Sequence, residues 1–575
     1  MIKNYTRKML LSALIGFLGL TSLNAQVMLK EIPLAQQIES SSLVVEGKVI
    51  SKESFWNADH TNIYTVNTVE VYKVFKGQPA TTVQVVTKGG TVGTMAQKVS
   101  PSLNLDTNDV GVFTLTNDAV DHANAFRAYA GVQGFYKYDL NRNVVTNPFH
   151  KMEGVESVYT EILSKTKSNF SEVLKFDALE LANKAAKSAK VLAPSSITYS
   201  PGEISAGTES VLTITGAGFG SVKGSVGFAN SSDGGVSTTY ALSTQVLTWT
   251  DTRITVEVPS LAGTGVITVV DANGDLSTSE DVLIVSFALL NNNNSGQAYL
   301  AQHYGDNGNG GFTWSQNSSF SANTAAAAAF LRALDTWRNE TKINWMLGED
   351  TSETDSGIDN LNLIGFSATL PEGYLGETIV YYDSCNSADW VVAEVDVLFT
   401  SEENWDYGPN LPFFDIDFES VALHELGHAH LLDHVIDSED LMDFDIGPGQ
   451  VTRTLSSTNK EAGDIIVAKS TTNSVCDYQL MTLYSGQLSV EEDVLESGID
   501  LYPNPANEAF FLKKASSINL QSVVIYDVNG RLISKHDASN TSGVQTISLS
   551  GISKGLYFVN INSDLATITK KLIVK

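Results

Sequence analysis

The sequence predicts a multidomain protein with an α+β domain, β-sandwich domains and a β-rich N-terminal domain. Its 575 residues exceed what a single hydrophobic core usually organises. Short runs of alternating apolar residues, separated by Gly-rich turns, recur along much of the chain and are typical of β-structure. An Ala-rich helical stretch and a His-rich one interrupt this pattern between residues 322 and 434, which indicates that the α+β domain lies there.

The chain begins with features of an export signal. Lys3, Arg7 and Lys8 precede an apolar run over residues 9–20, and a stretch that resembles a small-residue cleavage site follows. We therefore expect a signal peptide over residues 1–25. An apolar run of about a dozen residues is too short to span a bilayer comfortably. No other segment is long and apolar enough, so we expect no transmembrane segment in the mature protein.

Residues 26–190 form the next predicted domain. Residues 43–50 and 63–74 alternate in the manner of strands, and a helical pattern runs from about residue 155 to residue 190. The sequence leaves open whether this domain is a removable propeptide or a scaffold. It contains no cysteine, so it cannot close a metal site through a thiolate.

Residues 194–288 resemble an immunoglobulin-like domain of the IPT/TIG type. The resemblance depends on the segments 213–220, 249–252 and 256–259, in which short strands alternate with Gly-rich turns. It implies a spacer or a module that binds substrate or glycan. The Gly-rich stretch lacks the strand-turn-helix context of a phosphate site and is interpreted as a turn.

We expect the α+β domain to span residues 289–485. A helix over residues 322–338 carries four large apolar residues at near-helical spacing, suited to packing across a sheet: Phe330, Leu331, Leu334 and Trp337. Strand-like runs follow at residues 361–366, 378–382 and 390–400. In the last run apolar residues alternate with Glu394 and Asp396, the pattern of a half-exposed strand.

The most informative segment is His-Glu-Leu-Gly-His-Ala-His-Leu-Leu-Asp-His, residues 424–434. The six residues before it contain no Pro or Gly, so one helix can place His424 and His428 on the same face, where they can bind one metal ion. Glu425 then lies beside the metal, where it can accept a proton from water. On an unbroken helix His434 would lie about 15 Å further along the axis. The chain must therefore turn to bring in a third nitrogen, which leaves a fourth zinc position open.

Nearby polar residues are weaker candidates for the metal. His430 is rotated by about 240° from the first histidine around the helix, so we expect it at the surface or behind the ligands. If His434 were displaced, Asp437 or Glu439 could complete the site instead.

Residues 424–434 resemble the metzincin metalloproteases, most closely their matrixin-like branch, whose motif is His-Glu-x-x-His-x-x-Gly-x-x-His. The three histidines and Glu425 fall in register with it. The resemblance identifies Met442 as the Met-turn residue, which forms an apolar floor beneath the metal. Leu431 departs from the pattern, because the family has Gly there to end the helix in a left-handed conformation. Leucine would cost about 1 kcal/mol or more in that conformation, which packing or metal binding could offset unless the turn follows another path.

The resemblance implies a secreted endopeptidase that acts on proteins or peptides. Catalytic Zn²⁺ would be held by the three histidines, and Glu425 would be the general base that later returns a proton to the leaving amine. An edge strand near the site would bind the substrate backbone as an added strand, and we expect residues 390–400 to do so.

Two other functions remain open from the sequence. One is a surface adhesin or binding protein whose zinc site is structural or inactive, which Leu431 favours. Glu425 opposes it, because a structural zinc site needs no general base. The other is a zinc amidase that acts on non-protein amides.

The two cysteines, Cys385 and Cys476, both fall in the α+β domain. In an oxidising compartment they are expected to form a disulfide, with two buried thiols as the alternative. The acidic segment 349–359 could hold a structural Ca²⁺ ion through oxygen ligands, or could be a solvated loop.

The composition excludes some partners. The formal net charge is −29, so long-range repulsion opposes binding to nucleic acid or to an anionic membrane.

The chain ends, after a linker over residues 486–498, in a predicted β-sandwich over residues 499–575. Its Tyr-Pro-Asn-Pro opening at residue 502, the turn at residues 526–531, Gly-Leu-Tyr at residues 555–557 and a basic end resemble the sorting domain of the type IX secretion system of Bacteroidetes. The resemblance implies that the type IX machinery is a partner and that the protein is secreted or held at the outer-membrane surface. A fibronectin-like accessory module is the alternative.

Overall fold

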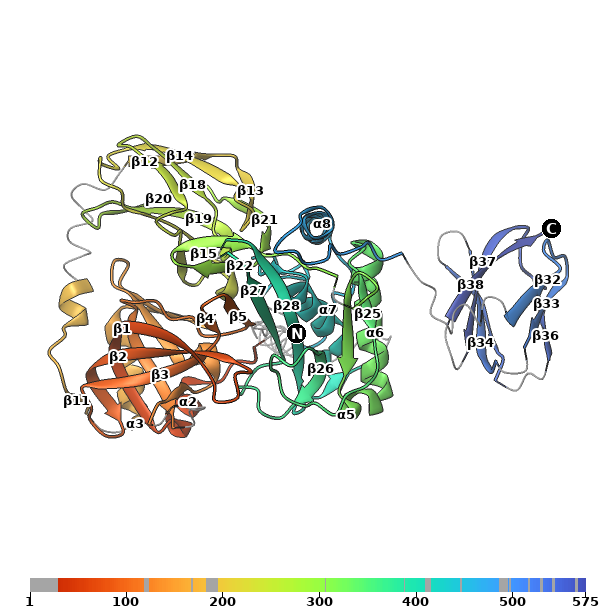
Figure 1. The fold of residues 1–575 in the computed structure, drawn as a ribbon, viewed down its shortest axis with the longest axis horizontal. Coiled ribbons are helices and arrows are strands. Elements are labelled where there is room, and N and C mark those ends of the chain that lie inside the picture. The colour runs from red at the N-terminus through yellow and green to blue at the C-terminus, as the bar shows by residue number, and fades with distance from the viewer. Residues whose placement is uncertain are drawn as a thin grey trace, which may run out of the picture. The chain divides into compact units, whose positions relative to one another are not determined.

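The chain divides into two compact units, Met1–Tyr484 and Ser485–Lys575 (Figure 1). The computed structural model describes residues 29–117, 122, 124–166, 169–182, 195–305, 307–386, 388–408, 415–444, 447–485, 495, 498–515, 518–527, 531–539, 543–563 and 567–575. The predicted signal peptide lies outside the described residues, as does nearly all of the predicted linker.

The first part of the larger unit is a nine-stranded sheet with two short helices against one face. Residues 43–50 and 63–74 are strands, as predicted. The helical prediction over residues 155–190 is only partly right: one helix ends at Thr166, a short strand follows, residues 178–182 are helical again, and residues 183–190 lie outside the described residues. The elements are α2 Leu34–Ser40, β1 Leu43–Trp56, β2 Ile63–Lys76, β3 Thr82–Lys88, β6 Val110–Thr116, β7 Arg127–Ala128, η1 Gly131–Gly134, β8 Phe135–Asp139, β9 Val144–Asn147, β10 His150–Glu153, α3 Val155–Thr166 and β11 Ser171–Glu172.

Residues 195–289 form a β-sandwich. Two four-stranded antiparallel sheets, β12-β14-β18-β17 and β16-β15-β19-β20, share one hydrophobic core, because alternate residues of each strand point inward. The elements are β12 Ser195–Ser200, β13 Glu203–Ala206, β14 Val211–Ala217, β15 Ser225–Asn230, η2 Ser231–Asp233, β16 Thr238–Tyr240, β17 Val246–Trp249, β18 Arg253–Glu257, β19 Ala262–Val270, β20 Leu276–Thr278 and β21 Ile284–Leu289.

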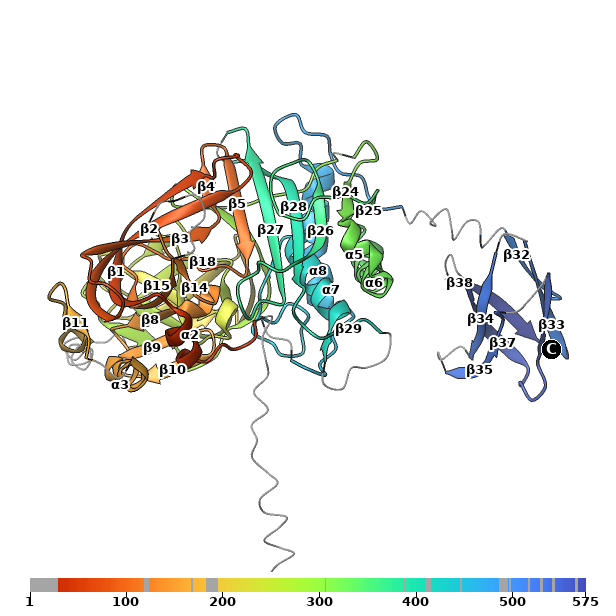
Figure 2. The same ribbon diagram turned by 90° about the horizontal axis from the view of Figure 1, so that it is seen from below.

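The third part is a seven-stranded sheet in the order β25-β24-β26-β28-β27-β5-β4. Its last two strands, β4 (Gly90–Val92) and β5 (Met95–Ser100), come from the N-terminal part of the chain (Figure 2). The other elements are β22 Asn291–Asn294, β23 Gln297–Leu300, β24 Phe312–Gln316, α5 Ser318–Ala322, α6 Thr324–Glu340, β25 Trp345–Leu347, β26 Asn362–Ser367, β27 Gly376–Ser384, β28 Trp390–Thr400, β29 Trp405–Asp406, β30 Ile416–Asp417, α7 Phe418–Ala429, β31 Leu432–Asp433 and α8 Ser457–Thr472.

Helices α6 and α7 pack against each other and into the core beside this sheet. Phe330, Leu334 and Trp337 of α6 are fully buried, as the periodicity predicts. Leu331 is 36% exposed, contrary to the prediction, because it lies about 100° around the helix from Phe330. Within the described residues no helix is both long and apolar enough to cross a membrane.

Strand β28 differs from its prediction in two ways. It lies between β26 and β27, so it is not an edge strand and cannot add a substrate strand. It is also buried on both faces. The loop before β26 covers Glu394 and Asp396, and backbone N–H groups donate to both carboxylates, those of Asn360 and Leu363 among them. The sequence pattern could not show this cover, because it comes from a loop that shares no periodicity with the strand.

The smaller unit is a β-sandwich with its own core, built from the sheets β32-β33-β36 and β35-β34-β37-β38. Its strands are β32 Ile499–Tyr502, β33 Ala509–Lys514, β34 Leu520–Asp527, β35 Leu532–Asp537, β36 Val544–Ser548, β37 Gly555–Ser563 and β38 Thr567–Val574.

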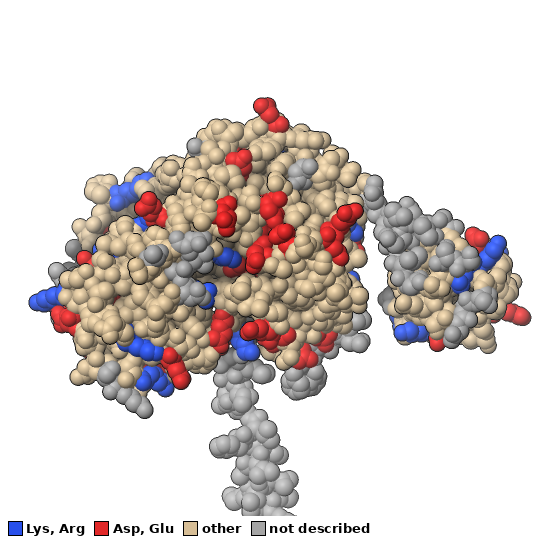
Figure 3. All heavy atoms as spheres, turned by 60° about the horizontal axis from the view of Figure 1, so that its bottom comes forward, with Lys and Arg blue, Asp and Glu red and all other residues tan. Residues whose placement is uncertain are grey.

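Acidic side chains outnumber basic ones on the face of the larger unit that Figure 3 shows. This distribution follows the acidic composition of the whole chain, 65 Asp and Glu against 36 Lys and Arg. Such a face repels polyanions.

Candidate metal centre

Helix α7 carries the first two histidines and is held at its N-terminus by charged groups. Asp417 is the N-cap residue, and its carboxylate accepts a hydrogen bond from Ser420 N at 3.0 Å. The guanidinium of Arg453 pairs with the same carboxylate. Every residue of α7 is buried, so it is a core helix with little freedom to move.

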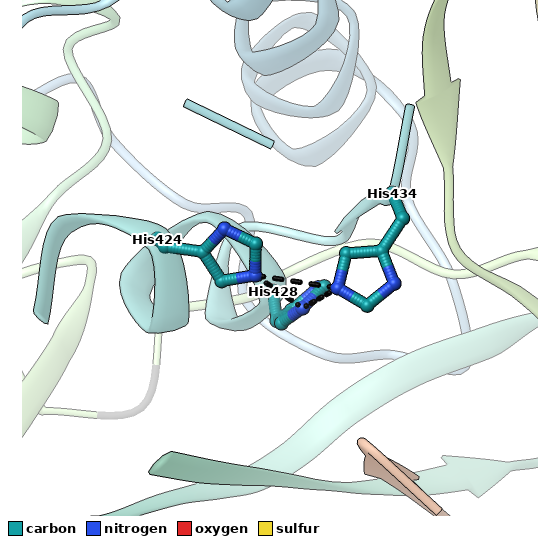
Figure 4. A group of neighbouring side chains, drawn as sticks. All are labelled: His424, His428 and His434. Carbon is teal, nitrogen blue, oxygen red and sulfur yellow. Dashed lines mark hydrogen bonds between the residues drawn. The ribbon is translucent and has the colours of Figure 1, made fainter. Parts of the chain in front are cut away.

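The three predicted ligands converge on one point (Figure 4). The Nε2 atoms of His424 and His428 lie 3.1 Å apart, and Nε2 of His434 lies 3.1 Å from His428 and 3.3 Å from His424. Zn–N bonds of about 2.0–2.1 Å in tetrahedral geometry place ligand nitrogens roughly 3.3 Å apart. The separations therefore fit a zinc ion. Among the described residues, this is the one group of three or more His, Cys, Asp or Glu close enough to share a metal.

The second ring nitrogens define which atoms this cluster offers to a metal ion. His424 Nδ1 lies 2.8 Å from Leu441 O, and His428 Nδ1 lies 3.0 Å from Leu432 O. A carbonyl can only accept, so each Nδ1 carries the proton and each Nε2 presents a bare lone pair. Two lone pairs 3.1 Å apart repel each other unless a positive charge lies between them. The donor set fits a divalent metal bound through Nε2.

Burial keeps the ligands neutral, as metal binding requires. Desolvation, followed by the neighbouring histidine His428, lowers the pKa of His424 to about 3. Desolvation also lowers the pKa of His428 and of His434 well below the ordinary value.

Glu425 points toward the strand β27. Thr378 Oγ1 lies 2.5 Å from Glu425 Oε2, and a Cβ atom at Gly376 would lie 2.5 Å from Oε1. Only glycine fits there without moving the carboxylate. Burial raises the pKa of Glu425 to about 8, and the hydrogen bond from Thr378 opposes that rise.

Met442, the predicted Met-turn residue, lies against helix α7, and its role beneath a metal stays a prediction. A Cβ atom at Gly427 would lie 2.4 Å from its sulfur, so helix and methionine pack in direct contact. Val435 N donates to Met442 O at 2.9 Å, and the neighbouring Leu441 carbonyl orients His424. The turn therefore both supports the helix and fixes one ligand ring.

Leu431 adopts a left-handed backbone conformation, with φ +68°. Its N–H donates to His428 O at 2.9 Å and its carbonyl accepts from Leu290 N at 2.8 Å. Its side chain is fully buried in the core. Strand β31, which follows, pairs with β21 of the sandwich. Packing and pairing thus hold a leucine in a backbone conformation that normally favours glycine.

The structure decides between the alternatives for two sets of neighbouring residues. His430 is not at the surface: it is fully buried beside the rings of Trp337 and Trp345, and its Nε2 lies 3.0 Å from Thr341 Oγ1. Its helical position faces away from the ligands, into the core. Asp437 and Glu439 are exposed on a turn and take no part in the cluster, because His434 itself reaches the site.

Three contacts of the site could not be predicted from the sequence. Thr378 approaches Glu425, Ser232 Oγ of the sandwich lies 3.4 Å from His434 Nδ1, and Ser100 Oγ of β5 lies 3.1 Å from His428 Nε2. Each residue comes from a distant part of the chain. No local pattern marks a lone Ser or Thr for such a role.

The structure joins Cys385 and Cys476 in a disulfide, with Cα atoms 5.6 Å apart. The acidic segment 349–359 forms no metal cluster within the described residues. Instead Gly357 N and Asp359 N donate to carboxylates of β28. The calcium ion stays a prediction.

Comparison with known proteins identifies the smaller unit. Residues 500–575 match the family described as "Secretion system C-terminal sorting domain". The chain is a type IX secretion substrate. It is therefore a secreted or outer-membrane-surface protein whose C-terminal unit engages the secretion machinery.

Two further likenesses are limited. Beta-agarase A of Zobellia galactanivorans is 39% identical over 84 residues, which are 15% of this chain and 14% of that protein, in the C-terminal region. The chain thus matches a small part of the length of that relative. A solved structure titled "Biofilm associated protein - BSP domain" aligns with this chain at 9% identity and a TM-score of 0.12. The alignment covers 93% of this chain and 81% of that structure. A likeness at that TM-score supports no inference.

Proposed function

We propose that this protein is a secreted, zinc-dependent endopeptidase of the metzincin type, in which an IPT/TIG-like sandwich accompanies the catalytic domain. One observation carries the proposal: three neutral Nε2 atoms converge at zinc-ligand separations, with the buried carboxylate of Glu425 next to them in sequence. Three protein nitrogens leave a fourth position for reactants.

The chain's own residues supply the acid-base steps. Zinc, when bound, would polarise the scissile carbonyl and make water more acidic. Glu425 accepts the proton of the attacking water and returns it to the leaving amine. Thr378 donates to Oε2 of that carboxylate, and the carboxylate lines the same small cavity as the three histidines. Burial raises the pKa of Glu425, which makes it a better proton acceptor once it is ionised.

An alternative is a surface-binding protein with a structural zinc site. Ser100 favours it, because its hydroxyl lies within reach of the metal position and could close the fourth place. A neutral hydroxyl is a weak zinc ligand beside Cys, His or carboxylate. A buried carboxylate without a charged partner also has no use in a structural site. The agarase likeness lies in the sorting region and bears on export, not on chemistry. A zinc amidase stays open and differs only in substrate.

The test combines metal content with substrate cleavage. Zinc-loaded mature protein is incubated with a denatured protein mixture, before and after limited trypsin treatment, and new termini are identified by mass spectrometry. Glu425→Ala should keep one zinc per chain and produce no new termini. Glu439→Ala, which removes an exposed carboxylate from the same region, is the matched control and should cleave normally. Bound zinc without any cleavage in either state would overturn the protease and favour the binding protein.

A further inference from the structure

We propose that strand β5 occupies the substrate-strand position of this site and keeps it closed from within the chain. This inference rests on the proposed function, because it concerns the regulation of the same site. It makes the N-terminal domain an internal inhibitor that works without a cysteine.

The pairing of β5 is that of a bound peptide. Strand β5 runs antiparallel along the outer edge of β27, from Met95 opposite Asp383 to Ser100 opposite Thr378. Without β4 and β5, β27 would be the free edge of the sheet. A free edge next to an active site binds an extended peptide through backbone hydrogen bonds. That edge is already filled by the chain itself.

The strand ends at the metal position. Ser100 Oγ lies 3.1 Å from His428 Nε2, the lone pair directed at the metal. The next residue is Pro101, which has no N–H and cannot extend the ladder. The Ser100 hydroxyl therefore lies where the water of the reaction would enter.

Two ion pairs hold the strand and the segment before it. Lys98 Nζ lies 3.6 Å from Asp433, between the second and third ligands in sequence, and Lys88 Nζ lies 2.6 Å from Glu377 of β27. Both carboxylates are nearly inaccessible to water. Lys98 compensates the buried charge of Asp433, so withdrawal of β5 would leave that carboxylate without its lysine. Lys88, the last residue of β3, ties the segment that leads into β5 to β27.

The space left beside the histidines is too small for a substrate. The cavity lined by Ser100, Pro101, Ser232, Phe444 and the ligands has a volume of about 60 Å³. Ligand sites in proteins usually measure about 300 Å³ or more. A peptide can reach the metal only after β5 leaves.

Side chains of β5 alternate between the two faces of the sheet, so neighbouring residues can serve as test and control. Lys98 and Ser100 share the face toward the motif, whereas Val99 faces the other way and packs against Ile379 and Tyr381. A ligand introduced at residue 100 should reach the metal, and one introduced at residue 99 should not.

The first experiment tests, without an activity assay, whether residue 100 lies at the metal position. The full-length chain is loaded with Co²⁺ in place of zinc, and near-ultraviolet absorption is recorded for Ser100→Cys and Val99→Cys. A thiolate is a strong ligand for such metals, so Ser100→Cys should show a thiolate-to-cobalt charge-transfer band and Val99→Cys should show none. A Ser100→Cys protein that binds cobalt without this band would overturn the inference.

The second experiment measures access to the metal. Acetohydroxamic acid is titrated into the cobalt-loaded chain and its binding is followed by the visible spectrum of the ion. Lys98→Glu places a second negative charge against Asp433 and should raise the apparent affinity by about tenfold or more, because the open state becomes more populated. The matched control is Lys52→Glu, which breaks an exposed ion pair with Asp106 and should leave affinity unchanged.

The outcomes separate this inference from the proposed function. If the wild-type chain binds no cobalt, the proposed metal centre is wrong, and so is the internal inhibitor, which depends on it. If cobalt binds, and the wild-type chain and Lys98→Glu bind the hydroxamate with equal affinity, the site is open. In that case only the internal inhibitor is wrong. A charge-transfer band together with increased access in Lys98→Glu supports both.

Discussion

Thr378 Oγ1 lies 2.5 Å from Glu425 Oε2 and 3.1 Å from the carbonyl oxygen of the same residue. This contact links the strand that would receive substrate to the helix that carries the proposed general base. A hydroxyl that donates to a carboxylate favours the ionised form. The acidity of Glu425 therefore depends on a side chain of strand β27.

Thr378→Val should lower kcat/KM by about tenfold, the value expected for loss of a hydrogen bond to a charged group. It should also move the acidic limb of the pH–rate profile to higher pH. Thr378 lowers the pKa of Glu425, so without it the carboxylate ionises at higher pH. Thr378→Ser retains the hydroxyl and should keep both values near wild type. An unchanged pH profile in Thr378→Val would show that this hydroxyl does not act on the base.

Metal removal should destabilise the larger unit. A ligand that binds only the folded state stabilises it by about 2.7 kcal/mol when present at one hundred times its Kd. We expect a chelator to lower the Tm of wild type and added zinc to restore it, measured by calorimetry. His428→Ala should show a low Tm that neither treatment changes. Equal responses of the two proteins would mean that zinc binds elsewhere.

Substitutions of Leu431 can distinguish the energetic cost of backbone strain from the stabilisation that side-chain packing provides. Leu431→Gly relieves the left-handed strain but leaves a cavity, because the side chain is fully buried. We expect the cavity to dominate and to destabilise the fold by about 2 kcal/mol, since buried Leu→Ala changes cost about 2–5 kcal/mol.

Leu431→Ala is the matched comparison, since it leaves a similar cavity but keeps the strain. It should be less stable than Leu431→Gly by about 1 kcal/mol in denaturant titrations. If alanine equals or exceeds glycine in stability, the left-handed conformation costs nothing at this position.

The buried ring of His303 should make the fold sensitive to acid. Both ring nitrogens lack a hydrogen-bond partner among the described residues, and the ring lies against Phe312 and Trp345. Burial, followed by the neighbouring His430, lowers the pKa of His303 well below its ordinary value. The unfolded chain therefore binds a proton near pH 6.5 that the folded chain does not.

Stability from this group should be complete above about pH 6.5 and should fall below it by up to about 1.4 kcal/mol per pH unit. His303→Leu should reduce that slope in urea titrations between pH 6.5 and 5. The exposed His60 provides the control, and His60→Asn, which tolerates the left-handed backbone there, should leave the slope unchanged. Equal slopes in wild type and His303→Leu would contradict this assignment.

Local patterns predicted the elements of this protein well. The spacing of His424 and His428 depends on one helix, and the sorting unit carries its motifs along its own length. The errors concern contacts between distant segments. Strand β28 has the alternation of a half-exposed strand, yet a loop that donates to Glu394 and Asp396 buries its polar face. The sequence showed these carboxylates but not their partners.

By itself, the sequence indicated the three histidines that converge, the carboxylate beside them and the nearby methionine, because these residues lie close together along the chain. It also indicated the sorting domain, through motifs spread along residues 499–575. Tertiary structure alone decided which strand is the edge of the sheet, and that Ser100 of a distant segment lies against His428. Strand pairing is a backbone interaction that almost any side chain permits. The residues of β5 therefore carry no sign in the sequence of their place beside the three histidines, which only the folded chain shows.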